Sequence, residues 1–215
     1  MRARKFACTQ VWWHDVLVGL RERKKQATRE ALREAALRLA LERGVDNVRV
    51  DEIADAAGVS PRTYNNYFAS REQAIVAAVT AEREARVAAA VAARPAGVGL
   101  ADAVVDAVVE QYTDPGEGAG DALLLITGNS ALRAAFVETA GGMESSLAGA
   151  IAGRVPGMGE RAARVLAASV AAAVRVGLGE WLPGGGGGFV VVSGSLPELL
   201  RGALEPLRPA LDAAG

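Results

Sequence analysis

Residues 50–72, VDEIADAAGVSPRTYNNYFASRE, combine two short helix patterns with a glycine between them. Ile53 and Ala57 fall four apart on one face of a first helix, which we expect to begin near Asp51 as its N-cap. We expect Gly58 to end that helix, because glycine adopts the left-handed conformation of a helix end without a Cβ penalty. The spacing predicts a helix-turn-helix.

The second helix of this unit is expected to begin at Ser60 and Pro61. Serine caps free N–H groups, and proline is pre-set for the first helical position. Tyr64 and Phe68 are four apart and are expected to face the core. The outward-pointing side chains are then Arg62, Thr63, Asn65 and Asn66. Asparagine can pair with adenine and arginine with guanine, so this face has the chemistry to read DNA.

Any two-helix corner with glycine and proline at its joint gives a similar pattern, so the flanking segments matter. Residues 24–44, KKQATREALREAALRLALERG, predict a helix with one apolar face and a terminal Gly44. Ser70 is the expected cap of a further long helix. The apolar positions of that helix keep the helical period at Ala74, Ile75, Ala78 and Val79.

Three segments, REAALRLALERG, VDEIADAAGVS and SPRTYNNYFASRE, resemble in this order and spacing the TetR family of bacterial repressors. The resemblance implies an all-α fold, in which an N-terminal three-helix DNA-binding domain joins a helical ligand-binding and dimerisation domain. We expect the first domain at residues 21–70 and the second at residues 71–215, after an extension at residues 1–20.

The resemblance also implies which residues meet DNA. The recognition helix should meet base edges and nearby backbone through Ser60, Pro61, Arg62, Thr63 and Asn65. Phosphates should be held by Asn66, Tyr67 and Arg71.

Three positions depart from the family pattern. Arg49 stands where a threonine commonly caps the second helix and touches phosphate, although arginine can make the phosphate contact instead. Asn65 replaces a frequent aromatic residue, which should change the operator preference. Ala40 replaces a common large apolar residue, so another side chain, such as Tyr64, must fill the small core.

Charge is unevenly distributed along the chain, although the formal net charge is only −1. Residues 1–43 hold 11 Lys and Arg against 5 Asp and Glu. A basic end gains affinity for DNA through counterion release, which is strongly salt-dependent. An ordinary solvated helix face is the alternative interpretation, and the adjacent motif favours the DNA-facing one.

Cys8 and His14 are the single cysteine and histidine, which excludes an intramolecular disulfide and a multi-histidine metal site. We expect no cofactor and a cytoplasmic protein. The N-terminus lacks a cleavage site and an unbroken apolar region, so it is not interpreted as a signal peptide. The longest apolar run, residues 165–174, is too short to span a bilayer, and no membrane partner is expected.

Residues 1–18 show no helical period. Three interpretations remain open: a disordered arm, an arm entering the minor groove through Arg2, Arg4 and Lys5, and an extension from a wrongly chosen start codon. Disorder or a wrong start is favoured over the DNA arm.

The rest of the chain predicts helices only, without strand alternation. The expected ranges are residues 71–94, 100–112, 121–126, 130–155, 160–181 and 197–211. The glycine run at residues 184–188 is interpreted as a linker, because no lysine with a following serine or threonine completes a phosphate-binding loop.

The last two long helices are the expected homodimer interface, as the resemblance implies. Small residues on one side of the first allow a second helix to approach closely, at Ala163, Ala167, Ala171 and Val174. The last helix adds Leu196, Leu199, Leu200, Leu204 and Leu207. A purely intramolecular core is the alternative.

The resemblance further implies an effector cavity in the second domain. Large aromatic or flexible side chains give contact area there, and the candidates are Tyr112, Phe136, Met143 and Trp181. Each also fits a plain core position. Because the domain shows no candidate for a buried charge, we expect a small apolar effector.

These expectations lead to one main hypothesis, a homodimeric repressor that a small ligand releases from a palindromic double-stranded DNA operator. A constitutive DNA-binding regulator without an effector is the first alternative. A helical enzyme is the second, and it is disfavoured because the acidic residues Asp102, Asp106 and Glu138 fit solvated faces rather than a catalytic pair.

Overall fold

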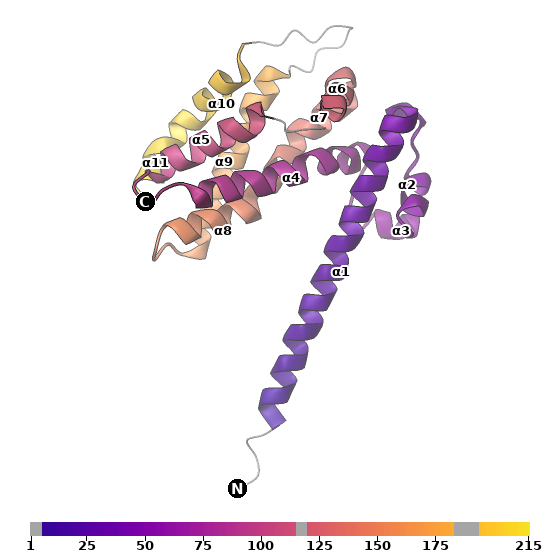
Figure 1. The fold of residues 1–215 in the computed structure, drawn as a ribbon, viewed down its shortest axis with the longest axis horizontal. Helices are drawn as coiled ribbons and strands as arrows, with labels where there is room; N and C mark the ends of the chain where they lie inside the picture. The colour runs from indigo at the N-terminus through magenta and orange to yellow at the C-terminus, as the bar shows by residue number, and fades with distance from the viewer. Residues whose placement is uncertain (1–5, 115–119, 183–193) are drawn as a thin grey trace.

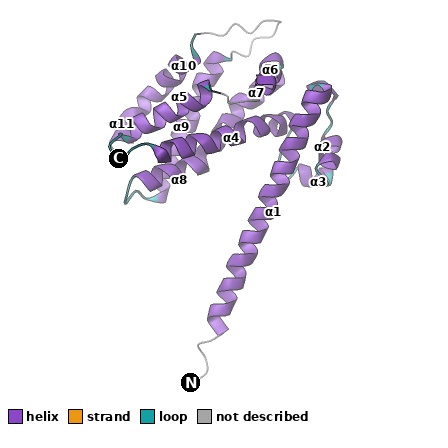
Figure 2. Ribbon diagram, viewed as in Figure 1, coloured by secondary structure: helices purple, strands orange, loops and turns teal. Residues whose placement is uncertain are grey.

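The computed structural model describes residues 6–114, 120–182 and 194–215. Within these ranges the regular elements are α-helices and short 3₁₀ turns, and no strand occurs there (Figure 2). The all-α fold expected from the sequence is therefore confirmed.

The first helix, α1 (Phe6–Arg43), is far longer than the expected 24–44 segment. Figure 1 shows its N-terminal part running away from the rest of the molecule. Residues 6–20, part of the extension expected at residues 1–20, continue α1 as helix. Extending an existing helix adds a hydrogen bond per residue without a new nucleation cost, so an apolar period is not required. Arg2, Arg4 and Lys5, the proposed minor-groove arm, lie outside the described residues.

The predicted helix-turn-helix is formed by α2 (Val50–Ala56) and α3 (Pro61–Tyr64), which follow a 3₁₀ turn at Val45–Asn47. Gly44 and Gly58 take positive φ values of 79° and 69°, which glycine adopts without a Cβ penalty. Two boundaries differ from the expectation. The N-cap of α2 is Arg49, two residues before the expected Asp51.

Helix α3 is also shorter than expected. Its α-helical part ends at Tyr64, and the next amides make tighter bonds, from Asn66 to the Thr63 carbonyl at 3.1 Å and from Tyr67 to the Tyr64 carbonyl at 2.8 Å. Asparagine is a poor helix former, and 3₁₀ bonding is common in last turns. Phe68 still bonds back to Tyr64 at 3.1 Å, so the turn brings both rings to the core side.

Helix α4 (Arg71–Ala93) connects the two parts of the molecule. It packs against α1 near its beginning and against helices of the second part further along (Figure 1). Of the predicted core positions, Ala74 and Ile75 are buried, whereas Ala78 and Val79 are half-buried. Helix α4 is therefore continuous between the two parts of the molecule.

The second part of the molecule is a stack of helices around an apolar core. Its α-helices are α5 (Leu100–Thr113), α6 (Gly120–Gly128), α7 (Ser130–Thr139), α8 (Glu144–Arg154), α9 (Glu160–Trp181), α10 (Leu196–Leu204) and α11 (Arg208–Asp212). Two expected helices are broken. A 3₁₀ turn at Ala140–Met143, with two glycines, divides the expected 130–155 helix, and one at Glu205–Leu207, with Pro206, divides the last helix.

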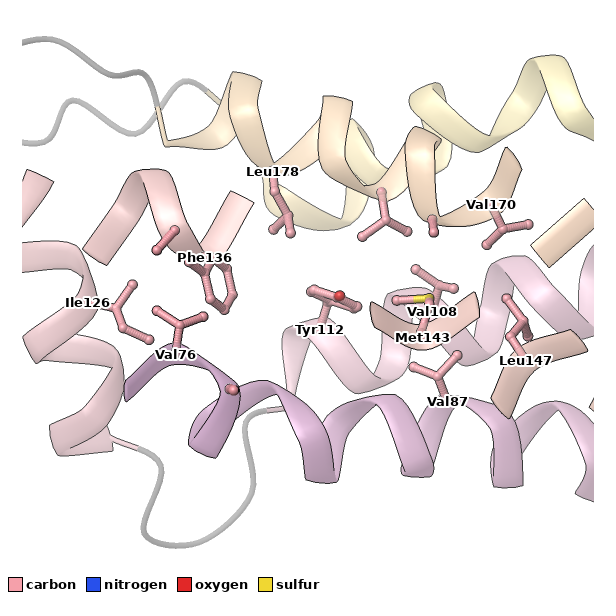
Figure 3. Packing of buried hydrophobic residues seen from close by; sticks show 14 of the residues in the cluster. Val76, Val87, Val108, Tyr112, Ile126, Phe136, Met143, Leu147, Val170 and Leu178 are labelled. Atoms are coloured by element: carbon pink, nitrogen blue, oxygen red, sulfur yellow. The ribbon is translucent and has the colours of Figure 1, made fainter. Parts of the chain in front are cut away.

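Figure 3 shows the core of this part, where Tyr112, Phe136 and Met143 lie among valine and leucine side chains from α4, α5, α8 and α9. Arg154 of α8 closes one end of the stack. Its guanidinium donates to the carbonyl oxygens of Arg94 at 2.6 Å and Val98 at 2.9 Å, in the connection between α4 and α5. The bond to Arg94 satisfies a carbonyl at the end of α4, and the bond to Val98 satisfies one in the loop before α5.

Helix α9 is, among the described residues, the one helix long and apolar enough to cross a membrane by length and composition alone. The core helix of a soluble protein passes the same test. One side of α9 is buried in this structure: the small residues Ala163, Ala167 and Ala171 lie within the protomer core. Gly177 permits close packing on α10, since a Cβ there would lie 3.3 Å from the Leu199 carbonyl oxygen. The glycine-rich segment at residues 184–188 lies outside the described residues.

Candidate nucleic-acid interface

The start of α3 is fixed by Ser60. Its Oγ accepts the backbone N–H of Thr63 at 3.2 Å and lies 3.0 Å from the Thr63 Oγ1. These contacts satisfy an open amide of the first turn, as expected of a serine N-cap. They also engage the Thr63 hydroxyl within the cap, so Thr63 supports the helix start as well as standing on the candidate DNA face.

Tyr64 anchors α3 to the core. Its side chain is fully buried, and its hydroxyl donates to the Ser70 carbonyl oxygen at 2.8 Å. Burial raises the pKa of Tyr64 above its ordinary value, so the phenol stays neutral. Its ring lies 5.8 Å from that of Phe68, and the Arg29 guanidinium of α1 lies 5.5 Å over the Phe68 ring. Three helices are thus tied together behind α3.

The opposite side of the same turn is exposed. Four predicted DNA-contacting residues lie together there with exposed side chains, namely Pro61, Arg62, Asn65 and Asn66. Tyr67 follows them and is half-buried. The backbone N–H of Asn65 bonds to the Pro61 carbonyl at 3.1 Å, and the side chain of Asn65 is exposed. This face offers the bidentate donors and acceptors that base edges require.

Arg49 lies at the N-terminus of α2, with an exposed side chain. The cap is completed without its guanidinium: the Arg49 N–H donates to the Glu52 Oε2 at 3.0 Å, the second half of a capping box. The Arg43 Nη1 lies 3.0 Å from the Glu52 Oε1. Glu52 therefore caps α2 in the absence of a threonine at position 49, and the exposed Arg49 guanidinium remains a candidate phosphate contact.

Arg71 is placed differently from the other predicted phosphate contacts. Its guanidinium donates to the Val48 carbonyl at 2.9 Å and the Asp46 carbonyl at 3.3 Å, and its Nε donates to the Glu72 carboxylate at 2.7 Å. Burial alone would raise the pKa of Glu72, but hydrogen bonds from Arg71 and Ser70 leave it below its ordinary value. Arg71 therefore connects the beginning of α4 by hydrogen bonds to the turn that precedes α2.

Sequence reasoning missed the supporting residues Arg29, Arg43 and Glu52. Glu52 carried a signal, since a glutamate three residues after an N-cap is typical of a capping box. The contact of Arg29 with Phe68 joins residues that are distant in sequence, and no local pattern predicts it.

The N-terminal unit matches a known family. The model of the tetR family of bacterial regulatory proteins covers residues 32–78, which include α2, α3 and the beginning of α4. Residues 32–78 are thus similar to the DNA-binding part of TetR-family proteins. The HTH-type transcriptional regulator TcmR of Streptomyces glaucescens is 42% identical to this chain over 79 residues. That match spans 37% of the chain and 34% of TcmR, about a third of the relative's length. The crystal structure of RolR in complex with the ligand resorcinol aligns with 86% of this chain and 89% of its own, at 21% identity and a TM-score of 0.39.

The predicted effector residues lie in the helical part that follows. Tyr112, Phe136 and Met143 are buried in one core, whereas Trp181 is half-buried at the end of α9 (Figure 3). None of the four lines either of two grooves found elsewhere. One groove, of about 1180 Å³, lies between α1 and α4, and the other, of about 1200 Å³, lies between α8 and α9.

One expectation about this part of the chain is wrong. We expected no buried charge in this part, yet Arg83 of α4 is only 4% exposed. Its guanidinium carbon lies 5.0 Å from the ring centre of Tyr112 and 5.6 Å from that of Phe136. In the sequence Arg83 lies between Glu82 and Glu84, a local pattern that does not indicate burial. Among the described residues, no group of three metal-ligating side chains occurs.

Proposed function

We propose that this protein is a cytoplasmic homodimeric repressor of the TetR family, which binds a palindromic operator and leaves it when a small effector binds. The observation that carries the proposal is the capped and anchored α3, which presents Arg62, Asn65 and Asn66 together on an exposed turn. The basic α1 lies beside this unit, where exposed Arg23, Lys24 and Lys25 add positive charge.

Homodimerisation is proposed because one short recognition helix makes few contacts, whereas two copies on a palindrome double them. The exposed side of α9 supports this role. Val165 and Val176 are 60% and 55% exposed, and half-buried Ala168 and Ala172 continue the same helical face. The groove between α8 and α9 adjoins this face. We propose that this side of α9, together with α10, packs against its copy in the partner subunit.

Effector control is proposed through α4. The helix begins beside the DNA-reading unit, where Arg71 bonds to the Val48 carbonyl. Further along, its Arg83 contacts the rings of Tyr112 and Phe136. A ligand with an apolar body that favours one arrangement of this core would move α4 and change the spacing of the two recognition helices. A near-complete switch needs about 5.5 kcal/mol of differential affinity.

Selection of bound duplexes from a random DNA library tests the proposal. We expect an inverted repeat whose half-sites lie about one helical turn apart, since a dimer places one α3 in each major groove. Binding of DNA without enrichment of any sequence would contradict the proposed repressor function.

A constitutive regulator without an effector is the second candidate. It is favoured by the packing of Tyr112, Phe136 and Met143, which are 7%, 3% and 0% exposed and line neither groove. This candidate predicts that DNA affinity is the same with and without small molecules that bind the protein.

A further inference from the structure

Arg83 is a buried cation whose donors are not all used. The side chain is 4% exposed, and its Nε and Nη1 have no hydrogen-bond partner among the described residues. Buried guanidinium groups are ordinarily paired, because the free energy of removing an ion from water amounts to several kcal/mol. Burial also lowers the pKa of Arg83 below its ordinary value, although an arginine stays charged.

The surroundings of Arg83 are aromatic on two sides. Tyr112 of α5 and Phe136 of α7 hold the guanidinium at 5.0 Å and 5.6 Å from their ring centres. Cation–π contacts of this kind offset part of the desolvation energy but leave the N–H donors without acceptors. A molecule that brings an anionic oxygen to these donors and a flat apolar body to these rings would satisfy both features.

We propose that Arg83 is the anion-binding residue of the effector site, and that the effector is an aromatic carboxylate. This inference rests on the proposed function, because it names the ligand class of the same regulatory domain. A carboxylate matches the guanidinium in charge and hydrogen-bond geometry, and its hydrogen bonds with a cation are stronger than those between neutral groups. The proposed effector therefore differs from the purely apolar one expected from the sequence by one acidic group.

The position of Arg83 also connects this site to the DNA-reading unit. Arg83 lies twelve residues after Arg71 on α4, which corresponds to about 18 Å along the helix. The neighbouring Glu84 lies against the backbone of Gly142, where a Cβ would be 2.7 Å from its Oε1. Burial raises the pKa of Glu84 to about 6, opposed by the charges of Arg29 and Arg33 on α1 and of Arg83.

An anion on Arg83 would cancel part of the positive field at Glu84. Glu84 would then be protonated more readily, and its attraction to the arginines of α1 would weaken. Because α1 also packs on Phe68 through Arg29, the effect reaches the helix-turn-helix.

The test uses the full chain and two probes with the same ring system, 2-naphthoate and neutral 2-naphthamide, with affinities measured by titration calorimetry at pH 7.5. We expect the wild-type protein to bind the carboxylate at least about tenfold more tightly than the amide, a factor equal to about 1.4 kcal/mol. Arg83→Met keeps an apolar side chain of similar length and should reduce this ratio to about one.

Arg86→Met is the matched control on the same helix. The Arg86 guanidinium already has partners, Gln111 at 3.0 Å and Glu82 at 3.0 Å, and its replacement should leave the ratio at the wild-type value. Circular dichroism establishes that each variant is folded, and Arg83→Lys gives a second variant that keeps the charge. A wild-type ratio near one, no binding of either probe, or an unchanged ratio in Arg83→Met would overturn the inference.

DNA binding in the same samples separates this inference from the proposed function. Release of selected DNA by 2-naphthamide as readily as by 2-naphthoate would overturn the role of Arg83 and leave the repressor standing. Absence of sequence-specific DNA binding without any probe would instead contradict the proposed function itself.

Discussion

The Tyr64 hydroxyl donates a hydrogen bond to the Ser70 carbonyl oxygen at 2.8 Å, and this bond ties the end of the recognition turn to the beginning of α4. The donor belongs to a fully buried side chain, and the acceptor residue caps α4 through its own Oγ, which receives the N–H of Gln73 at 3.2 Å. The orientation of α3 and the start of α4 therefore depend on the same few atoms.

Replacing Tyr64 by phenylalanine should lower the free energy of unfolding by about 1 to 2 kcal/mol. The substitution removes the donor and leaves the Ser70 carbonyl without it, while the ring packing with Phe68 is kept. Urea denaturation measures the change. Tyr67→Phe is the control, because Tyr67 is only half-buried, and it should change the stability by less than about 0.5 kcal/mol. Equal losses in both variants would contradict the role given to the Tyr64 hydroxyl.

Arg71→Ala should destabilise the protein by about 1 to 3 kcal/mol, because the Val48 and Asp46 carbonyls lose a charged donor. Denaturation of the variant measures this loss. The salt dependence of DNA binding measures whether Arg71 also contacts phosphate, as the family resemblance implied. A slope of log affinity against log salt concentration that is smaller by about one unit would support that contact. A wild-type slope would mean that Arg71 only holds α4 to the preceding turn. Wild-type stability in Arg71→Ala would contradict the fastening role.

Glu84 should make the stability of the protein fall as pH rises from about 4.5 to 6. Its pKa is 4.5 ordinarily and about 6 in the folded protein, so the folded state binds the proton more tightly and loses that advantage as the proton leaves. Glu84→Gln does not titrate. Between pH 4.5 and pH 7 the free energy of unfolding of Glu84→Gln should therefore rise by about 1 to 2 kcal/mol relative to that of the wild-type protein.

Denaturation curves across this pH range measure the Glu84 effect. Glu82→Gln is the control, since Glu82 is exposed and forms a surface pair with Arg86. Wild-type and Glu84→Gln curves that run parallel from pH 4.5 to 7 would show that Glu84 titrates normally.

Val176→Arg should shift the protein from dimer to monomer, because it places a charge on the exposed side of α9 that we propose to be buried between subunits. Sedimentation velocity measures the distribution. Leu124→Arg is the matched control: Leu124 is 71% exposed on α6, away from that side, and should leave the dimer intact. An undisturbed dimer in Val176→Arg would place the interface elsewhere.

Local signals in the sequence predicted the helix-turn-helix well. Ser60, Pro61 and Gly58 act through their own backbone and nearest neighbours, so their positions alone indicate where α2 ends and α3 begins. The all-α fold and the TetR resemblance, carried by the same segment, are confirmed. The exact N-cap of α2 and the end of α3 differ from the expectation by a few residues, and residue propensities do not locate helix ends that closely.

Long-range relationships could not be predicted in the same way. Arg71 contacts carbonyls more than twenty residues earlier in the chain, and Arg83 is buried by α5 and α7. A helical period marks both arginines as ordinary charged positions. The alanine stripe of α9 shows the same limit, because small residues permit close packing without indicating whether the neighbour belongs to the same chain.

Binding of the Asn65→Ala and Asn66→Ala variants to the selected operator and to random duplex DNA tests the DNA-reading role of α3. We expect Asn65→Ala to lose about 1 to 3 kcal/mol on the operator with unchanged affinity for random DNA, because Asn65 is placed at base edges. Asn66→Ala, proposed to contact phosphate, should weaken binding to both by similar factors. Equal losses for Asn65→Ala on operator and random DNA would contradict sequence reading by this face.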